Sequence, residues 1–580
     1  MTAVRGFTAV VCLLAATSLA AQTPTPTPKV VPVRPTPPPV VPTTEPVTAQ
    51  VSADTDKDLN DPRALKLTLD DALKTAVEGN IGIQLERYTY LEAGQSLRGS
   101  YGIFDWLATA DVERQSAKSP TTSQFAPSGN RATIANFGIS QLIPTGGSYS
   151  VLFNNSRGTT TGGGTFINPA YRSSLGLGFN QPLMRNFGVD VTRRGITIAR
   201  NTLGINREVF RGALMDTAIT TEQAYFDLVY ARQFVDVVKE ALFLARDQSR
   251  ITQIRIDVGA SAPLDILQPR VQIATQEENL IVAVASVRDA EDRLRAVMHL
   301  DPADWNRPII PTTPVGYTPI TVNQEAAVAQ ALQLRPELHE FQLTTATRQV
   351  QYLYARNQAL PQLDLKLNYN AAGLAGRAQE FDPVTGLPTG RFNTTGYSNA
   401  ISQIFGNDFP SWIVGFNVGL PVTNIGARAE RKRAELDVAR AKTDEEQTRQ
   451  NIAIEVRKTA RDIDTTAKEI GASRTAREAA EQNLDAERRR YENGMTTNFQ
   501  VLQIQQQLSD ARAREIQALV AYNKSVAAYH RAVGDLLDVA NIRVEEPKIE
   551  EPSTFRSFDR YNWLNYGRVQ PTTTTGETKQ

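Results

Sequence analysis

Residues 255–273 of the chain read RIDVGASAPLDILQPRVQI, and residues 490–508 read RYENGMTTNFQVLQIQQQL. At a constant offset of 235 residues, the identical positions of the two stretches include Arg255 and Arg490, Gly259 and Gly494, Leu267 and Leu502, and Gln268 and Gln503. Each stretch joins two very long helical segments through a turn that contains glycine. A repeat of this size indicates that half of a protein was duplicated, because solenoid units are much shorter.

The composition is that of a folded protein without an electrostatic preference for nucleic acid. The chain has 580 residues, of which 41% are hydrophobic and 21% are charged. Lysine plus arginine and aspartate plus glutamate number 62 each. Because the phosphate backbone is bound through an excess of basic residues, this balance gives no case for a nucleic-acid partner.

The N-terminus predicts export. Residues 1–21 contain Arg5, a short apolar run from Phe7 to Leu19, and small residues suited to cleavage, which is the pattern of a secretory signal peptide. A buried N-terminal helix is the less favoured alternative, since a proline-rich stretch follows at once. Cys12 is the only cysteine and lies inside this segment, so the mature chain is predicted to have no disulfide and no cysteine metal site. The mature chain offers no run of 18 apolar residues, so it is either soluble or crosses the outer membrane as a β-barrel.

Composition and periodicity divide the chain into six parts. We predict a signal peptide at 1–21, a proline-rich disordered linker at 22–65, a first structural repeat at 66–300, an inter-repeat linker at 301–324, a second repeat at 325–540, and a C-terminal tail at 541–580.

Each repeat is predicted to contain a pair of long helices. Residues 189–258 and 428–493 lack proline, and the first of these runs would extend for about 105 Å as a helix. Their partners are predicted at 264–300 and 499–539. The last of these helices carries two apolar stripes, which suits a helix packed between two neighbours in a closed cylinder. A four-helix bundle is the alternative that periodicity alone leaves open.

Between the helices, apolar residues alternate with polar residues and glycine. The alternating segments are 137–143, 149–153, 175–179, 363–369 and 412–420, and Gly146 and Gly147 form a turn between the first two. Such strands suit a barrel with lipid outside and water inside, whereas a soluble sheet with one wet face is the alternative. Too few strands occur in one chain to close a barrel of eight, so closure requires several chains.

The order and spacing of several segments resemble the TolC-like outer-membrane efflux proteins. The similar segments are the two glycine turns, Leu360-Pro361 before a strand, Trp412–Gly426 before an Arg/Ala-rich helix, Leu334–Leu338, and Tyr529–Gly534. The resemblance covers about residues 66–540. It implies a mixed α and transmembrane β fold, in which three chains form a 12-stranded β-barrel that continues into a long α-helical barrel. Four strands would then come from each chain, and the extra pair around Gly146 and Gly147 would lengthen strands or form an extracellular hairpin.

The resemblance also implies a function, a location and partners. The chain would be the outer-membrane exit duct of a tripartite efflux pump or a type I secretion system, and would transport small molecules or polypeptides passively. It would form a homotrimer in the lipid of the cell outer membrane, extend into the periplasm, and act with a periplasmic adaptor (membrane fusion) protein and an inner-membrane pump. A soluble periplasmic coiled-coil scaffold is the alternative, but only the duct requires the alternating strands.

By the same resemblance, two groups of residues are candidate sites. The hairpin tips that would contact the adaptor are Val258, Gly259, Ala260, Asn493, Gly494 and Met495. The periplasmic aperture would be lined by Asp265, Tyr491, Gln500 and Gln503, with a bond from Tyr491 to Asp265 holding it shut. Where the family often has acidic residues, Gln500 and Gln503 are uncharged, and Thr496 replaces a basic residue.

Simpler roles remain open for these residues. The glycines suit a sharp turn with positive φ. Asp265 suits a first helical turn, where the helix dipole favours it, and Thr497 with Gln500 suits a capping box.

The sequence does not predict an enzyme or a cofactor. Its three histidines, His299, His339 and His530, lack the spacing of a metal site or a catalytic triad. The chain also lacks a phosphate-binding glycine motif followed by Lys-Ser or Lys-Thr. Energy for transport would therefore come from a partner.

Overall fold

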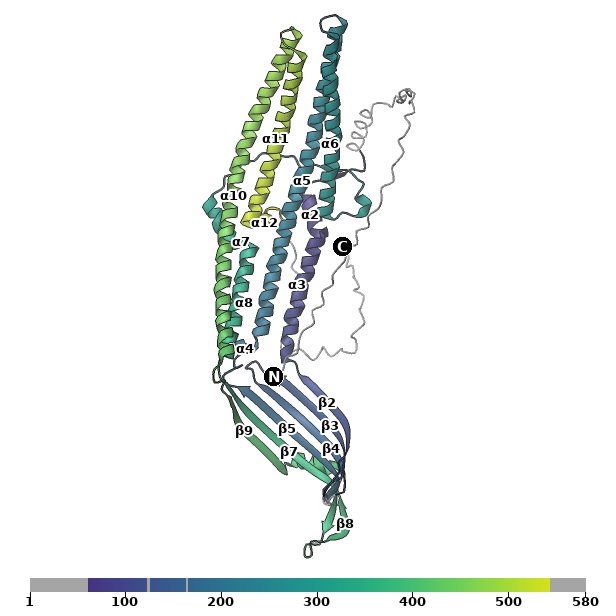
Figure 1. Ribbon diagram of the computed structural model, residues 1–580, viewed down its shortest axis with the longest axis vertical. Helices are drawn as coiled ribbons and strands as arrows, with labels where there is room; N and C mark the ends of the chain where they lie inside the picture. Colours follow the sequence, from purple (N-terminus) through teal and green to yellow (C-terminus); the bar gives the residue numbers. More distant parts are fainter. Residues whose placement is uncertain (1–60, 123–125, 163–164, 543–580) are drawn as a thin grey trace, which may run out of the picture. The chain divides into compact units, whose positions relative to one another are not determined.

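The computed structural model describes residues 61–122, 126–162 and 165–542 (Figure 1). The predicted signal peptide, most of the proline-rich linker and almost all of the C-terminal tail lie outside the described residues. The predicted division into six parts therefore stays a prediction.

Helices and strands alternate along the chain in blocks. The first half contains β1 (Leu65–Leu67), α2 (Leu69–Gly79), α3 (Ile81–Ser100), the 3-10 turn η1 (Tyr101–Phe104), β2 (Leu107–Lys118), β3 (Gly129–Leu142), β4 (Ser148–Thr161), β5 (Ile167–Pro182), α4 (Val189–Thr192), α5 (Arg194–Asp257), the 3-10 turn η2 (Pro263–Ile266) and α6 (Leu267–Met298). The 3-10 turn η3 (Pro302–Asp304) and β6 (Ile309–Pro311) follow. The second half contains α7 (Gln324–Leu334), α8 (Pro336–Gln358), β7 (Gln362–Phe381), β8 (Pro388–Thr394), α9 (Tyr397–Gly406), β9 (Phe409–Gly419), α10 (Ile425–Glu492), α11 (Asn498–Val533) and α12 (Leu536–Val539).

The two proline-free segments form the longest helices, as predicted. Helix α5 has 64 residues and α10 has 68, and each turns back through a short connection into its partner, α6 or α11. At 1.5 Å per residue, each long helix extends for about 100 Å. In Figure 1 the hairpin of α5 and α6 and the hairpin of α10 and α11 run beside each other.

Helix α11 packs against helices on two of its sides. Val501, Ile504 and Leu508 are buried together with Leu484 of α10 and lie against Leu244 of α5. One of the two apolar stripes predicted for this helix therefore packs between two neighbours, α10 and α5. Small and branched side chains at three- and four-residue spacing allow this close approach on both sides.

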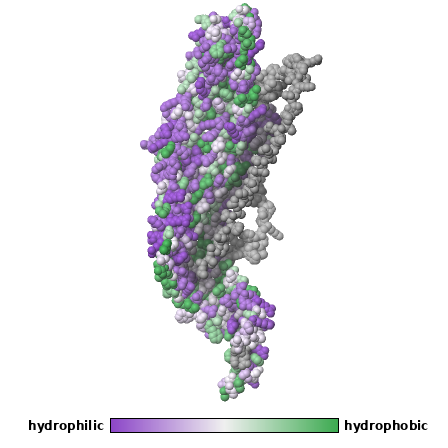
Figure 2. All heavy atoms as spheres, in the orientation of Figure 1, coloured by the Kyte–Doolittle hydropathy of each residue, from purple (hydrophilic) through white to green (hydrophobic). Residues whose placement is uncertain are grey.

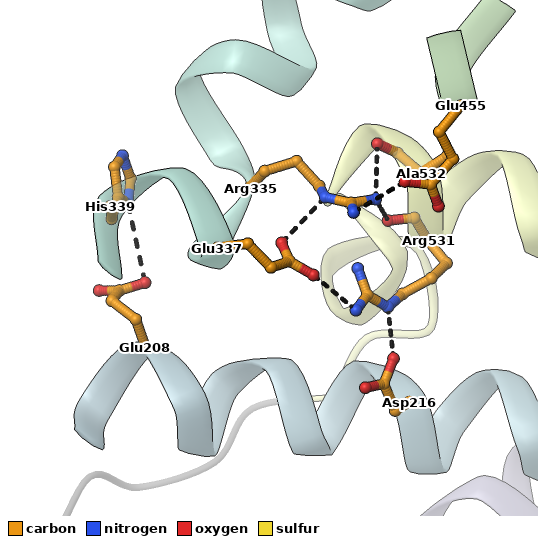
Figure 3. A network of polar contacts seen from close by, with 8 residues as sticks. All are labelled: Glu208, Asp216, Arg335, Glu337, His339, Glu455, Arg531 and Ala532. Atoms are coloured by element: carbon orange, nitrogen blue, oxygen red, sulfur yellow. Dashed lines mark hydrogen bonds and ion pairs between the residues drawn. The ribbon is translucent and has the colours of Figure 1, made fainter. Parts of the chain in front are cut away.

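A charged network joins four helices where the two recognisable motifs of the second half meet (Figure 3). Arg335 is only 6% exposed, and its guanidinium contacts Glu337 and Glu455, each at 2.9 Å. It also donates to the carbonyl oxygen of Ala532 at 3.2 Å. Arg531 binds the other oxygen of Glu337 at 2.8 Å. Two of the segments that resemble the family thus have a structural role, because Leu334–Leu338 contacts Tyr529–Gly534 at the C-terminal end of α11.

Electrostatics in this network favour the ionised carboxylate. Burial raises the pKa of Glu337, but the neighbouring guanidinium groups of Arg531 and Arg335 outweigh burial and lower it below its usual value. Arg531 also contacts Asp216 of α5 at 2.7 Å, so the network connects α5 to α8 and α11.

Apart from β1 and β6, which form a separate parallel pair, the strands form one antiparallel sheet with six long members. Hydrogen bonds connect β2, β3, β4, β5, β7 and β9 in that order, and their lengths range from 11 to 20 residues. The short strand β8 pairs with β7 near Phe381, at the end away from the long helices. β9 pairs with the same edge of β7 nearer the long helices, from Gln362 to Ala372. One chain therefore has six long strands in this sheet, where four were predicted, whereas the barrel that three chains would form stays a prediction.

The additional strands come from the β3–β4 hairpin, which extends through the full height of the sheet. Its turn lies at the helical end, where the amide of Gly188 donates to the carbonyl oxygen of Thr145 at 3.0 Å, just before α4. At the other end of the hairpin, the amide of Ser128 donates to the carbonyl oxygen of Thr161 at 2.9 Å. The hairpin is therefore part of the sheet, and β3 and β4 lie between β2 and β5.

Candidate functional site

The six-stranded sheet has one apolar and one polar face. Residues that lie opposite each other in antiparallel strands share a face, and successive residues alternate between faces. One row across all six strands is Ala108, Ile139, Val151, Leu177, Tyr369 and Trp412. The adjacent row, which points to the opposite face, is Thr109, Gly138, Leu152, Gly176, Asn370 and Ser411. In these rows the first face is apolar in every strand, and the second is mostly small or polar. Further from the long helices, the first face carries Asn155 and Ser173, which are buried, and α9 packs on it there: the hydroxyl of Tyr397 donates to the side-chain oxygen of Asn155.

Large side chains on the apolar face are exposed within the single chain. Phe137 is 50% exposed, Val414 is 58% exposed and Phe416 is 65% exposed. Contiguous exposed apolar surface of this kind marks a protein or membrane contact. Trp106, Trp412 and Phe416 lie on this face, whereas Phe409 pairs with Ala372 and points to the opposite face.

Both edges of the sheet are free in the part of the chain that the structure describes. There, β2 pairs only with β3, and β9 pairs only with β7 and not with a further strand. Every residue of β2 and almost every residue of β9 is exposed. Two long edges with unpaired backbone groups are templates for another strand.

Glycines form both hairpin turns, as predicted. Gly259 has φ = +74° and Gly494 has φ = +73°, values that cost little only for a residue without a Cβ. The flanking side chains point outwards, since Val258 is 72% exposed and Met495 is 75% exposed. The other predicted tip residues, Ala260 and Asn493, are also exposed.

The two turns are tied to each other by contacts that the sequence analysis did not find. Arg255 of α5 lies over the ring of Tyr491 of α10, with 4.7 Å between its guanidinium carbon and the ring centroid. It also donates to the main-chain carbonyl oxygen of Tyr491 at 2.5 Å. Gln248 donates to the side-chain oxygen of Asn498 at 2.7 Å.

The residues predicted to line the aperture do not form the expected bond within one chain. The hydroxyl of Tyr491 is buried 3.4 Å from the hydroxyl of Thr252. The carboxylate of Asp265 accepts from the amide of Ala262 at 3.0 Å, as a first-turn residue does. The predicted bond from Tyr491 to Asp265 is therefore wrong for the single chain, because each group already has a local partner.

The remaining aperture residues are exposed near the tip. Gln500 and Gln503 lie in the first turns of α11, and both are exposed to solvent. Thr497 is the N-cap residue of α11, but its side chain makes no capping hydrogen bond, so the alternative of a capping box is also wrong.

The histidines lie far apart and have ordinary surroundings. The ring of His530 is 2.9 Å from Asp535, and His339 is 3.7 Å from Glu208. His299 ends α6 with φ = +50°. Among the described residues, no group of three metal-binding side chains comes together, and no helix is long and apolar enough to cross a membrane. The visible face of the helical part is mainly hydrophilic (Figure 2).

Comparison with known proteins identifies the family. The outer membrane efflux protein model matches residues 148–298 and 327–535, which are more than half of the chain. The chain belongs to the outer membrane efflux protein family. This membership confirms the predicted resemblance and the predicted location in the outer membrane.

Individual relatives agree with the family match. The outer membrane efflux protein BepC of Brucella suis biovar 1 is 25% identical over 476 residues, which cover 80% of this chain and 92% of BepC. Among solved structures, the outer-membrane channel OprN superposes with a TM-score of 0.57 at 15% identity, covering 82% of this chain and 91% of OprN. The CmeC outer membrane channel of Campylobacter jejuni has the same TM-score at 16% identity, covering 83% of this chain and 87% of CmeC. At these identities the structural matches show a shared fold.

Proposed function

We propose that the protein is the passive outer-membrane exit duct of a tripartite efflux pump or a type I secretion system. Three copies would join their sheets into a transmembrane barrel, and their helices would form a tunnel that extends into the periplasm. Each chain would contribute two structural repeats, at 66–300 and 325–540. The cargo would be small molecules or polypeptides, and the duct would have no catalytic role.

The sheet is the observation that carries this proposal. Its apolar face is exposed in one chain, its opposite face is mostly small or polar, and both of its edges lack a partner. Lipid would cover the first face, water would fill the lumen against the second, and neighbouring chains would pair with the edges. A soluble coiled-coil scaffold, the alternative, gives no reason for an exposed apolar wall.

Unequal burial at matching positions of the two predicted repeats supports the trimer. Leu502 is 6% exposed on α11, a helix that packs against both α10 and α5 of the same chain. Leu267 holds the matching position on α6, but it is 54% exposed. A neighbouring chain packed on α6 would bury Leu267 as well, which would remove apolar surface from water.

The hairpin tips suit a protein partner. Val258, Leu264, Met495 and Phe499 are between 57% and 75% exposed, although they lie at the ends of otherwise hydrophilic helices. Exposed apolar side chains beside rigid glycine turns can be buried by a partner at low entropic cost. We propose the periplasmic adaptor as this partner, with an inner-membrane pump supplying the energy.

Asp265, Gln500 and Gln503 would line the periplasmic aperture in this arrangement. Their side chains are exposed at the starts of the returning helices. Tyr491 would act indirectly, since its contacts with Arg255 and Thr252 hold the two hairpins of one chain together.

Cell fractionation followed by crosslinking tests the proposed function. We expect the mature chain to sediment with outer membranes and to crosslink as a trimer. Recovery as a soluble periplasmic monomer would refute the duct and favour the scaffold.

A further inference from the structure

Resting on the proposed function, we propose that the assembled duct has an eighteen-stranded barrel, with six strands from each of three chains. A barrel diameter grows roughly in proportion to its strand number, so this barrel would be about 1.5 times as wide as one of twelve strands. The partner in this inference is a second copy of the chain, whose β2 edge would pair with the β9 edge of the first. Its consequence is a wide exit that does not limit the size of cargo at the outer membrane.

The β3–β4 hairpin provides the two additional strands, and its length is sufficient to span a membrane. Each of its strands has 14 residues, whereas a transmembrane strand needs about 9 to 11. β3 pairs with β2 along all 12 residues of β2, and β4 pairs with β5 from Ser148 to Gly158. The hairpin is therefore inserted into a continuous ladder, and β2 and β5 are held apart by two strands.

Side chains of the hairpin follow the two faces of the rest of the sheet. Phe137, Ile139, Val151 and Phe153 continue the apolar face, and all four lie in register with apolar residues of the flanking strands. On the opposite face, a methyl group at Gly138 would come within 2.7 Å of the hydroxyl of Thr109, so this side of the wall is tightly packed. A hairpin outside the membrane would not need a lipid-facing side that matches its neighbours.

The hairpin is also anchored at the level where the other strands meet the helices. A methyl group at Gly146 in its turn would lie 2.3 Å from the carbonyl oxygen of Asn186, in the segment between β5 and α4. Thr145 donates from its hydroxyl to the side-chain oxygen of Gln181 at 2.8 Å. The two strands of the hairpin extend over the same height of the sheet as β2 and β5. The hairpin therefore belongs to the membrane-spanning wall.

The free edges would close the barrel between chains. β2 has 12 residues and β9 has 11, and each carries apolar residues on the same face of the sheet, such as Val112 and Val414. Pairing β9 of one chain with β2 of the next would satisfy both edges and keep the apolar face continuous.

Pairs of introduced cysteines test whether the hairpin is inserted between β2 and β5. The only native cysteine is Cys12, which lies in the predicted signal peptide. Ala110→Cys with Phe137→Cys, and Phe153→Cys with Leu175→Cys, place thiols on directly opposed residues, at a separation that a disulfide can bridge. Both pairs should form intrachain disulfides in membranes. Ala110→Cys with Leu175→Cys is the control and should not, because three strand spacings of about 4.8 Å separate them. A disulfide in the control pair would mean that β2 and β5 adjoin, and would overturn the inference.

A second set of pairs tests closure between chains. Val414→Cys is combined in turn with Ala108→Cys, Ala110→Cys and Val112→Cys, and at least one combination should give covalent dimers and trimers. Val414→Cys with Val151→Cys is the control and should give neither, because β4 is flanked on both sides by strands of its own chain. Interchain bonds in the control but not in the β2 series would overturn the pairing of these edges.

Electron cryomicroscopy of the unmodified protein in nanodiscs decides the strand number without relying on any variant. Eighteen strands around a threefold axis support the inference. Twelve strands around a threefold axis overturn it and leave the proposed duct intact, whereas a protein without threefold assembly refutes the proposed function itself.

Removal of residues 120–165 would join β2 to β5, and the largest polyethylene glycol that enters from the extracellular side should then become smaller.

Discussion

Replacement of Arg335 by alanine should destabilise the protein strongly. Its guanidinium is the donor for the carbonyl oxygen of Ala532 and a charge partner for Glu337 and Glu455. Breaking a fully buried ion pair costs about 3–5 kcal/mol, and a buried acceptor left without a donor costs about 1–3 kcal/mol. The two carboxylates are partly exposed, at 32% and 45%, so water would recover part of this cost. We therefore expect a loss of about 3 kcal/mol.

Urea unfolding of the purified protein, followed by the helical circular dichroism signal, measures this loss. Lys432→Ala is the matched control, because Lys432 and Glu435 are 64% and 47% exposed and such surface pairs contribute at most about 1 kcal/mol. Arg335→Lys should fall between the two, since an ammonium keeps the charge but not the planar set of donors. A loss for Arg335→Ala no larger than that for Lys432→Ala would refute the structural role assigned to the network.

Three further substitutions are expected to have measurable effects. Gly494→Ala should destabilise the hairpin by about 1–2 kcal/mol because φ is +73°, whereas Gly426→Ala at the start of α10 should be neutral or stabilising; urea unfolding of the two variants compares them. Gln500→Asp should increase the cation preference of single channels, and unchanged selectivity would remove Gln500 from the aperture. The pKa of Glu222 is raised to about 7, chiefly by burial; His530 lowers it and Asp70 raises it by smaller amounts. The folded chain therefore retains a proton that the unfolded chain loses above the ordinary glutamate pKa of 4.5. Stability should therefore fall by roughly 3 kcal/mol as pH rises from about 4.5 to 7, and Glu222→Gln should abolish this fall in unfolding curves measured at pH 5 and pH 8.

The long helices were predictable because their determinants are local. α5 and α10 lie in runs without proline, and the turns after them require glycine at positive φ. A proline-free apolar pattern and a glycine are visible in the sequence itself, so these elements were found close to their true ends.

The strand number was not predictable because the pattern in the sheet is weak. β2 reads LATADVERQSAK, in which short alanines share the apolar face with Val112, and the alternation is lost towards Lys118. β3 and β4 alternate only over their halves nearest the helices, and towards Thr161 both become rich in threonine, asparagine and glycine. A strand in a water-filled wall needs apolar residues on one face only, so its signal is weaker than that of a helix.

The contacts between the hairpin tips depend on tertiary packing. Arg255 and Tyr491 are 236 residues apart, and nothing in either local sequence predicts that one side chain covers the other. The predicted bond from Tyr491 to Asp265 does not form within one chain, because a helical start supplies Asp265 with the amide of Ala262. Sequence reasoning found the two glycine turns, but not which side chains pair beside them.

Conductance of the purified protein in a planar lipid bilayer tests the central claim most directly. The account predicts that protein isolated as a trimer inserts and gives discrete single-channel currents, and that Gln500→Asp shifts their reversal potential under a salt gradient. Trimers that insert without conducting, or protein that never inserts, would contradict the assignment of this chain as an outer-membrane duct.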